Sequence, residues 1–197
     1  METNANYLES VIKLFSYYKA LAEKAIDQLE PDQLFVTANE DSNSIAVIMK
    51  HLAGNMRSRW TDFLTSDGEK QWRNRDGEFI EEPQEKSALM SDWESGWKCL
   101  FEALENLSPE QLDQIVYIRN EGHTAADASN RQLAHYPYHV GQIVFYAKML
   151  KNGGWKSLSI PRNASASYNK DKFSKEKSVR HFTDSEIGDR NAKEERQ

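Results

Sequence analysis

The sequence predicts an all-α protein: an up-and-down four-helix bundle with long irregular connections and an irregular C-terminal tail. Apolar residues recur at the three-four spacing of an amphipathic helix in four long segments, and prolines and polar turn residues separate these segments. After Trp155 the composition changes to Ser, Asn, Lys and Asp. A chain of 197 residues is long enough for one core. We therefore expect one domain over residues 1–155 and an irregular or disordered extension over 156–197.

The first two helices are predicted over residues 5–29 and 44–64. Pro31 stops the first helix, and Ser42 or Ser44 is expected to cap the second at its N-terminus. The buried side of the second helix is predicted to carry Ile45, Ile48, Met49, Leu52, Met56, Trp60 and Phe63.

The link over residues 65–84 is too polar and too rich in turn residues for a helix, so we interpret it as an excursion with a turn at Asp76-Gly77. A third helix is predicted over 85–107, and Pro109 marks its end. The segments "QLEPDQLF" (28–35) and "NLSPEQLD" (106–113) resemble each other and follow the first and third helices in the same way. This similarity gives mild support for two related helix pairs.

Residues 114–119, "QIVYIR", are β-branched and aromatic, which predicts a short strand or extended link before the last helix. That helix is expected to start near Thr124 or Asp127. It ends at "KNGG" (151–154), where Gly153 is the expected C-cap.

Composition excludes several classes of function. The net charge is -6, and no stripe of Lys and Arg with interleaved aromatics suggests binding to nucleic acid or an anionic membrane. A single cysteine, Cys99, excludes an intrachain disulfide and a thiolate-rich metal site. The sequence has no apolar run of about 18 residues, and its start does not resemble a signal peptide. We therefore expect a cytoplasmic protein.

The stretch "HYPYHVGQ" (135–142) carries His135 and His139, which lie four residues apart. Residues at this spacing stand one above the other on a helix, so both rings can point at one ion. His51, near the buried side of the second helix, is the candidate third ligand. Three imidazoles leave coordination positions open to water or substrate. The alternative is that each ring is half-buried and hydrogen-bonded without a metal.

Two other histidines, His123 in a turn and His181 in the tail, are left out of the predicted site. Pro137, between the paired histidines, lacks an N–H and crowds the carbonyl of Leu133, which predicts a bend.

Four further side chains are candidates for the surroundings of the site. Arg131 precedes His135 by one turn and is suited to a carboxylate of substrate or thiol. Gln142, beyond His139, is expected to orient a ligand histidine or a metal-bound water. Tyr146 and Asn55 lie on the same helical faces as the histidines. A surface or packing role is the alternative for each.

The segments "HYPYHVGQIVFYAK" and "KHLAGN", with "WRNRDGEF" and "NRQLAHYPYHVGQI", resemble the DinB-like (YfiT-like) superfamily of metalloenzymes, in one of its uncharacterised bacterial branches. The similarity covers about residues 5–160. It implies a four-helix bundle that holds a divalent ion, nickel or zinc, with His51, His135 and His139. Members of that superfamily with known activity are mostly thiol-dependent S-transferases or isomerases, whose ion holds a low-molecular-weight thiol as the thiolate.

Two functions follow as hypotheses. The first is a metal-dependent transferase or related enzyme that acts on a small-molecule substrate through an activated thiol or water, and the resemblance implies a thiol-dependent S-transferase. The second is a non-catalytic stress-response protein that binds a metal or small ligand. A third, weaker hypothesis is a decayed site whose surface or tail binds a partner. Monomer and homodimer are both left open, and no nucleic acid or membrane partner is expected.

Overall fold

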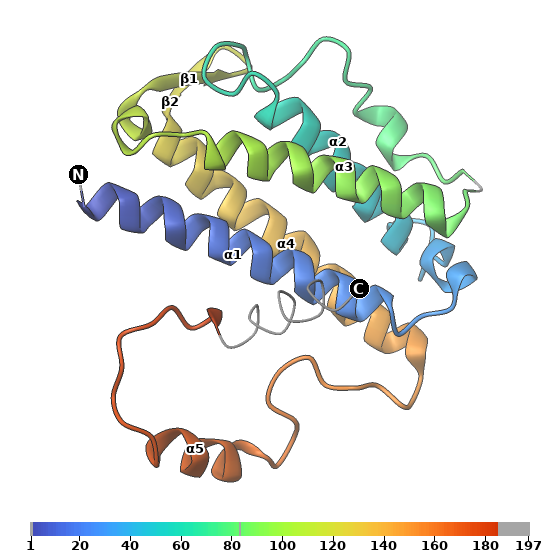
Figure 1. The fold of residues 1–197 in the computed structure, drawn as a ribbon. Coiled ribbons are helices and arrows are strands. Elements are labelled where there is room, and N and C mark those ends of the chain that lie inside the picture. The colour runs from blue at the N-terminus through green and yellow to red at the C-terminus, as the bar shows by residue number, and fades with distance from the viewer. Residues whose placement is uncertain (1, 83, 185–197) are drawn as a thin grey trace.

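Four long helices carry the core, and the all-α prediction is confirmed. The computed structural model describes residues 2–82 and 84–184 (Figure 1). Each long helix lies within a few residues of its predicted position, although the second ends at Trp60 rather than Leu64. These helices are α1 (Glu2–Ile26), α2 (Ile45–Trp60), α3 (Lys86–Glu105) and α4 (Ala125–Lys151).

Side-chain caps fix the starts of the two helices that carry the histidines. The Ser44 hydroxyl accepts a hydrogen bond from the backbone N–H of Val47 at 3.1 Å, and Thr124 accepts one from Asp127 at 3.0 Å. Each cap satisfies a backbone donor that the first turn would otherwise leave unpaired. At the end of α4 the left-handed capping residue is Asn152, with φ 43°, one residue before the predicted Gly153.

The long helices do not alternate strictly in direction, so the up-and-down prediction is wrong in this respect. Arg57 pairs with Asp92 at 2.9 Å, and Thr61 contacts Cys99 at 3.4 Å. Residue numbers therefore increase in the same direction along α2 and α3, so these two helices run parallel (Figure 1). Parallel neighbours need a connection that returns along the whole helix, about 24 Å for 16 residues. The long link after α2 is this crossover.

One aromatic ring from each long helix meets the others in the centre of the core. Phe15 lies 6.3 Å from Trp60, 6.3 Å from Trp97 and 5.7 Å from Tyr136 between ring centroids. All four side chains are buried. The Tyr136 hydroxyl also donates to Asn55 at 3.0 Å and accepts from the indole N–H of Trp60 at 3.2 Å. These contacts fix the register of α2 against α4.

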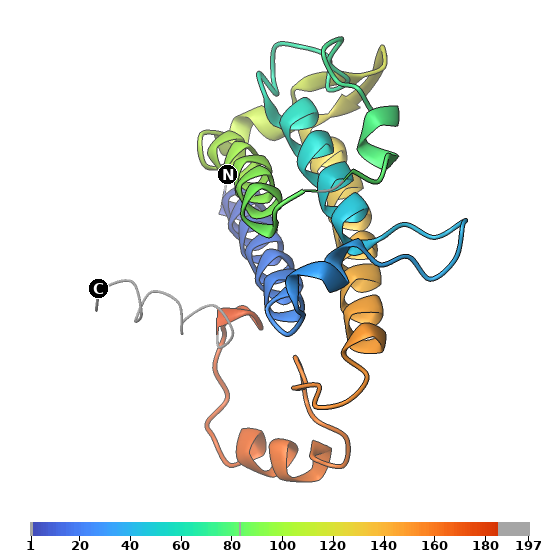
Figure 2. The same cartoon turned by 90° about the vertical axis from the view of Figure 1, so that its right-hand side faces the viewer.

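The crossover is ordered and packs on the molecule. It contains a short 3₁₀ helix, η2 (Asp76–Phe79), which lies beside α2 (Figure 2). The Asp67 carboxylate accepts hydrogen bonds from the backbone N–H groups of Arg119 and Asn120 at 2.9 and 2.8 Å. The crossover is thereby tied to the hairpin that precedes α4.

That hairpin confirms the predicted strand and adds its partner. Strand β1 (Ile115–Ile118) pairs antiparallel with β2 (Glu121–Thr124). Arg119 and Asn120 between them have φ values of 54° and 63°, as a two-residue turn with the twist of a hairpin requires.

The two similar segments noted in the sequence form matching 3₁₀ helices, η1 (Pro31–Phe35) and η3 (Pro109–Asp113). Each starts with a proline and a reciprocal capping box, closed by Gln33 in η1 and Gln111 in η3. The similarity therefore has a local cause, the same capping chemistry after two different helices.

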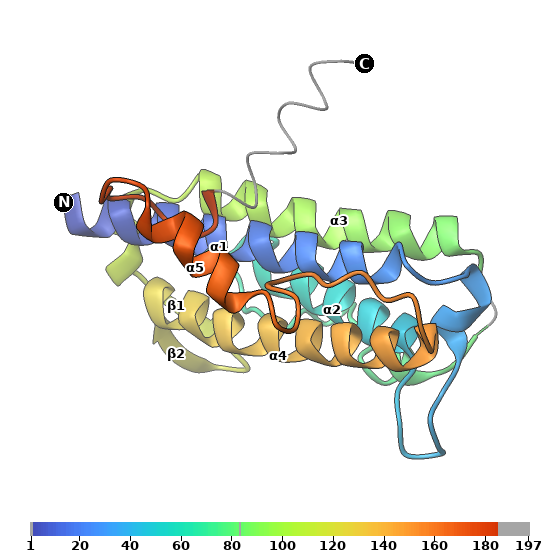
Figure 3. The ribbon, with the colours of Figure 1, turned by 90° about the horizontal axis from the view of Figure 1, so that it is seen from below.

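The extension after Trp155 is not wholly irregular. It forms the short helix α5 (Ser165–Phe173), set apart from the long helices, and returns to α1 (Figures 1 and 3). Asp184 pairs with Lys13 at 3.0 Å, and the His181 ring lies 3.2 Å from the Ser10 hydroxyl. The prediction for residues 185–197 lies outside the described residues. No helix in the described ranges is long and apolar enough to span a membrane.

Candidate metal centre

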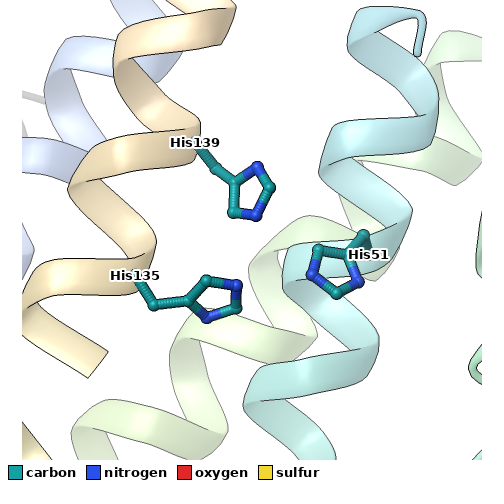
Figure 4. Close-up of side chains that lie close together, drawn as sticks. All are labelled: His51, His135 and His139. Atoms are coloured by element: carbon teal, nitrogen blue, oxygen red, sulfur yellow. The ribbon is translucent and has the colours of Figure 1, made fainter. Parts of the chain in front are cut away.

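Three histidine rings from two helices share one space. Helices α2 and α4 lie side by side, and His51 of α2 faces both His135 and His139 of α4 (Figure 4). One possible ligand atom from each ring lies within 4.8 Å of the others. The ring centroids are 4.8 to 5.5 Å apart. The structure therefore brings together the three residues that the sequence singled out.

Each ring has one nitrogen, Nδ1, beside an oxygen acceptor. The Nδ1 atom of His51 lies 3.0 Å from the Glu78 carboxylate. In α4, Nδ1 of His139 lies 2.8 Å from Oε1 of Gln142, and Nδ1 of His135 lies 3.4 Å from Oε1 of Gln132. An oxygen acceptor stabilises a proton on Nδ1, so the lone pair of a neutral ring is on Nε2. All three rings can thus present Nε2 to one ion.

Glu78 is an ionised acceptor. Burial alone would raise its pKa, but hydrogen bonds from His51 and Arg73 and the positive charge of Arg73 outweigh burial and lower the pKa of Glu78 below its usual value. Arg73 donates from Nε and Nη2 to the two carboxylate oxygens, each at 2.8 Å. An ionised carboxylate only accepts hydrogen bonds, which assigns the donor role to Nδ1 of His51. A carboxylate behind a histidine is a recurrent support of metal ligands.

The crossover delivers Glu78 to α2 at a glycine. A Cβ on Gly54 would lie 2.2 Å from Oε1 of Glu78, so only glycine leaves room for the carboxylate there. The Phe79 ring is tilted against the His51 ring, with the two ring centroids 4.9 Å apart. The Arg75 guanidinium lies over the Phe79 ring, 5.1 Å from its centroid. The excursion whose role the sequence left open therefore orients a candidate ligand.

The surroundings keep the α4 histidines neutral. Burial, together with the neighbouring His139 and His51 rings, lowers the pKa of His135 to about 3. Burial also lowers the pKa of His139, with a smaller contribution of the same sign from His51, whereas the hydrogen bond with Gln142 opposes the shift. Neutral imidazole is the form that binds a metal.

The other predicted side chains have different roles. Asn55 accepts from Tyr136 and so links α2 to α4 rather than contacting the histidines. Arg131 is exposed and forms no hydrogen bond or ion pair within the described ranges. Tyr146 and Gln142 line a cavity of about 390 Å³ that opens beside Ile48. The three histidines are not among its lining residues, and Gln142, whose Oε1 lies beside His139, connects it to the cluster.

Two histidines stay outside the cluster, as expected. His123 lies in β2, and His181 contacts Ser10 and Thr183. Pro137 sits within α4, which is continuous from Ala125 to Lys151.

A family model described as "Protein of unknown function (DUF1572)" matches residues 2–164. The chain belongs to the DUF1572 family. The match covers all four long helices and both helices that carry the cluster. A search of the curated proteins and a search of the solved structures each found no match.

Sequence reasoning missed Glu78, Arg73 and Gln132. For Gln132 a signal exists: it precedes His135 by three residues, as Gln142 follows His139 by three, and residues three apart are neighbours on a helix. For Glu78 the only signal is indirect, a glycine three residues after His51.

Proposed function

We propose that this DUF1572 chain is a four-helix-bundle metalloprotein of the DinB-like type that binds a divalent ion, nickel or zinc, through His51, His135 and His139. The observation that carries the proposal is the shared orientation of the three rings. Each has Nδ1 beside an oxygen acceptor, which leaves Nε2 for the ion. Unrelated buried histidines have no reason to share this pattern.

The donor set fits such an ion. Imidazole suits nickel and zinc, and three protein ligands leave positions for a further ligand. The three possible ligand atoms lie at most 4.8 Å from one another. Each has to move by about 0.7 Å toward a common centre to reach the roughly 2.0–2.1 Å of a metal–imidazole bond. Small side-chain rotations of the three rings can make this adjustment, so the residues present suit the ion.

We further propose that the activity is S-transfer from a low-molecular-weight thiol to a small electrophile. The ion would supply a thiolate at neutral pH by lowering the thiol's pKa. The sulfur then forms a bond to an electrophilic carbon while the bond from that carbon to its leaving group breaks. Glu78, Gln132 and Gln142 hold the ligand rings in place. Cys99 of α3 is not needed, and it contacts Thr61 instead.

A specific observation favours the alternative, a non-catalytic protein that binds a metal or small ligand. The carboxylate that contacts the cluster, Glu78, is committed to Arg73 and His51. It is therefore poorly placed to take a proton from a substrate. Water-based chemistry lacks an obvious base here, whereas thiol transfer needs none beyond the ion.

Elemental analysis of protein purified without a polyhistidine tag tests the metal site. We expect about one nickel or zinc ion per chain in the wild type, a strong loss in His51→Ala, and retention in His123→Ala, which changes a histidine outside the cluster. Equal metal content in the two variants would overturn the site. Light scattering on the same samples would tell monomer from homodimer.

A screen of common low-molecular-weight thiols against electrophilic substrates separates the enzyme from the binder. Turnover that needs the ion and is lost in His139→Ala supports the transferase. Full metal content without turnover for any thiol would support the binding protein.

A further inference from the structure

A second feature of α2 is a buried arginine without a partner. Arg59 is only 4% exposed, yet its Nε and Nη1 atoms are buried and have no hydrogen-bond partner within the described residues. Arginine stays charged at neutral pH, and an uncompensated buried charge is costly. Native proteins rarely leave such a group unpaired unless a ligand or ion completes it.

The chain makes room for this guanidinium rather than merely tolerating it. A Cβ on Gly68 would lie 2.6 Å from Nη1 and 3.0 Å from Cδ of Arg59. Gly68 is itself fixed, because its N–H donates to the carbonyl of Tyr117 at 2.8 Å and its carbonyl accepts from the Ser58 hydroxyl at 3.0 Å. The crossover is thus held over Arg59 at a residue with no side chain.

The charges around Arg59 do not neutralise it. The charged groups that influence it include the cations Arg131 and Arg73 and the carboxylates Glu69 and Asp67. Asp67 accepts hydrogen bonds from the backbone N–H groups of Glu69, Arg119 and Asn120. Glu69 is already paired with Arg73 at 3.3 Å and with Arg119 at 3.2 Å. Arg131 makes no ion pair in the part of the chain that the structure describes. Arg59 and Arg131 are thus two guanidinium groups without an ion pair among the described residues, and each feels the charge of the other, which favours an anion near them.

Arg59 and Arg131 lie on the same two helices as the histidine cluster, toward the C-terminal end of α2 and the N-terminal end of α4. Arg59 follows His51 by eight residues and so shares its helical face, and Arg131 precedes His135 by one turn of α4. The Arg59 charge is also felt at the His135 ring. A ligand bound at the histidines can extend toward the two arginines.

We propose that Arg59 and Arg131 form an anion subsite that receives a carboxylate or phosphate group of the ligand bound at the histidine cluster. This inference rests on the proposed function and makes its ligand an oxyanion-bearing molecule. Guanidinium groups bind both anions through paired N–H donors, so the chemistry is shared. The anion belongs either to the thiol or to its electrophilic partner.

Thermal unfolding of the metal-free full chain tests the subsite without thiol or metal. The probe is 10 mM inorganic phosphate against sodium chloride of equal ionic strength at pH 7.5. A phosphate Kd of about 1 mM would raise the Tm by about 3–6 °C. We expect this shift to vanish in Arg59→Gln and to persist in Arg57→Gln, a matched control on α2 that pairs with Asp92. It should also persist in His51→Ala.

No phosphate shift in the wild type, or an equal shift in Arg59→Gln, would overturn the subsite. If Arg59→Gln does not fold, Arg131→Gln decides, because this exposed residue can change without loss of the core. Its phosphate Kd is expected to rise at least about tenfold, and an unchanged Kd would overturn the pair.

Calorimetry on the zinc-loaded chain then identifies the source of the anion. If the thiol carries it, glutathione should bind at least about tenfold more tightly than its diethyl ester, and Arg59→Gln should remove the difference. Equal binding of the two thiols, with the phosphate shift intact, assigns the anion to the electrophilic substrate. A phosphate shift with no thiol binding at all keeps the subsite and rejects the thiol function.

Discussion

Replacing Gly54 by alanine should separate the support of the metal site from its ligands. The new Cβ would lie 2.2 Å from Oε1 of Glu78, far inside contact, so the carboxylate has to leave. Its hydrogen bonds to Arg73 and His51 are then lost, at about 1.5–3 kcal/mol for each bond to a charged group. The higher helix propensity of alanine offsets only about 1 kcal/mol of this loss. Two of these bonds go to Arg73 and one to His51, so we expect a net loss of about 3–8 kcal/mol in the free energy of unfolding.

Metal binding should weaken together with stability. Loss of a supporting carboxylate typically weakens a metal site by about 10–100-fold. Chelator competition on the untagged protein measures the metal Kd, and urea unfolding measures stability. The control is Gly141→Ala in α4, where a Cβ meets nothing within 4 Å. It should gain up to about 1 kcal/mol and bind metal normally. If both variants bind metal equally well, Glu78 does not support the site.

Three further predictions follow from the contacts described. In the metal-free protein the pKa of His135 is lower than in the unfolded chain, so the unfolded state takes up a proton on this ring first as the pH falls. The urea midpoint of unfolding should therefore decrease as the pH drops from about 6.5 toward 3, and a midpoint that does not change with pH contradicts this. Tyr136→Phe leaves Asn55 and Trp60 unpaired and should cost about 1–3 kcal/mol in thermal unfolding with metal content unchanged, whereas a loss of metal would place the hydroxyl in the site. Thr124→Ala removes the cap of α4 and should cost about 1 kcal/mol, measured by urea unfolding; no loss would show that the cap is idle.

The helices and the histidines could be predicted because both depend on local spacing. Apolar periodicity located α1 to α4, and a four-residue interval on one helix puts His135 and His139 on one face whatever the tertiary structure. His51 was predicted from its position on an amphipathic helix. These features need only the geometry of a single helix.

The direction of α3 and the identity of Glu78 could not be predicted for a common reason. Periodicity shows which face of a helix is buried but not which way the helix runs beside its neighbour. The crossover has no regular period, so nothing in its sequence tells which of its many acidic side chains reaches His51. Only the packing of η2 on α2 and the gap at Gly54 select Glu78.

The crossover between α2 and α3 also sets an order of events in folding. His51 and His135 are 84 positions apart in the chain, and Glu78 arrives from a segment that has to return along the full length of α2. Such long-range contacts form late, since loop closure costs entropy before the contacts repay it. An ion held by all of them would bind the native state far better than the folding transition state. Metal loading should then slow unfolding and leave the folding rate almost unchanged, which makes the ion a source of kinetic persistence.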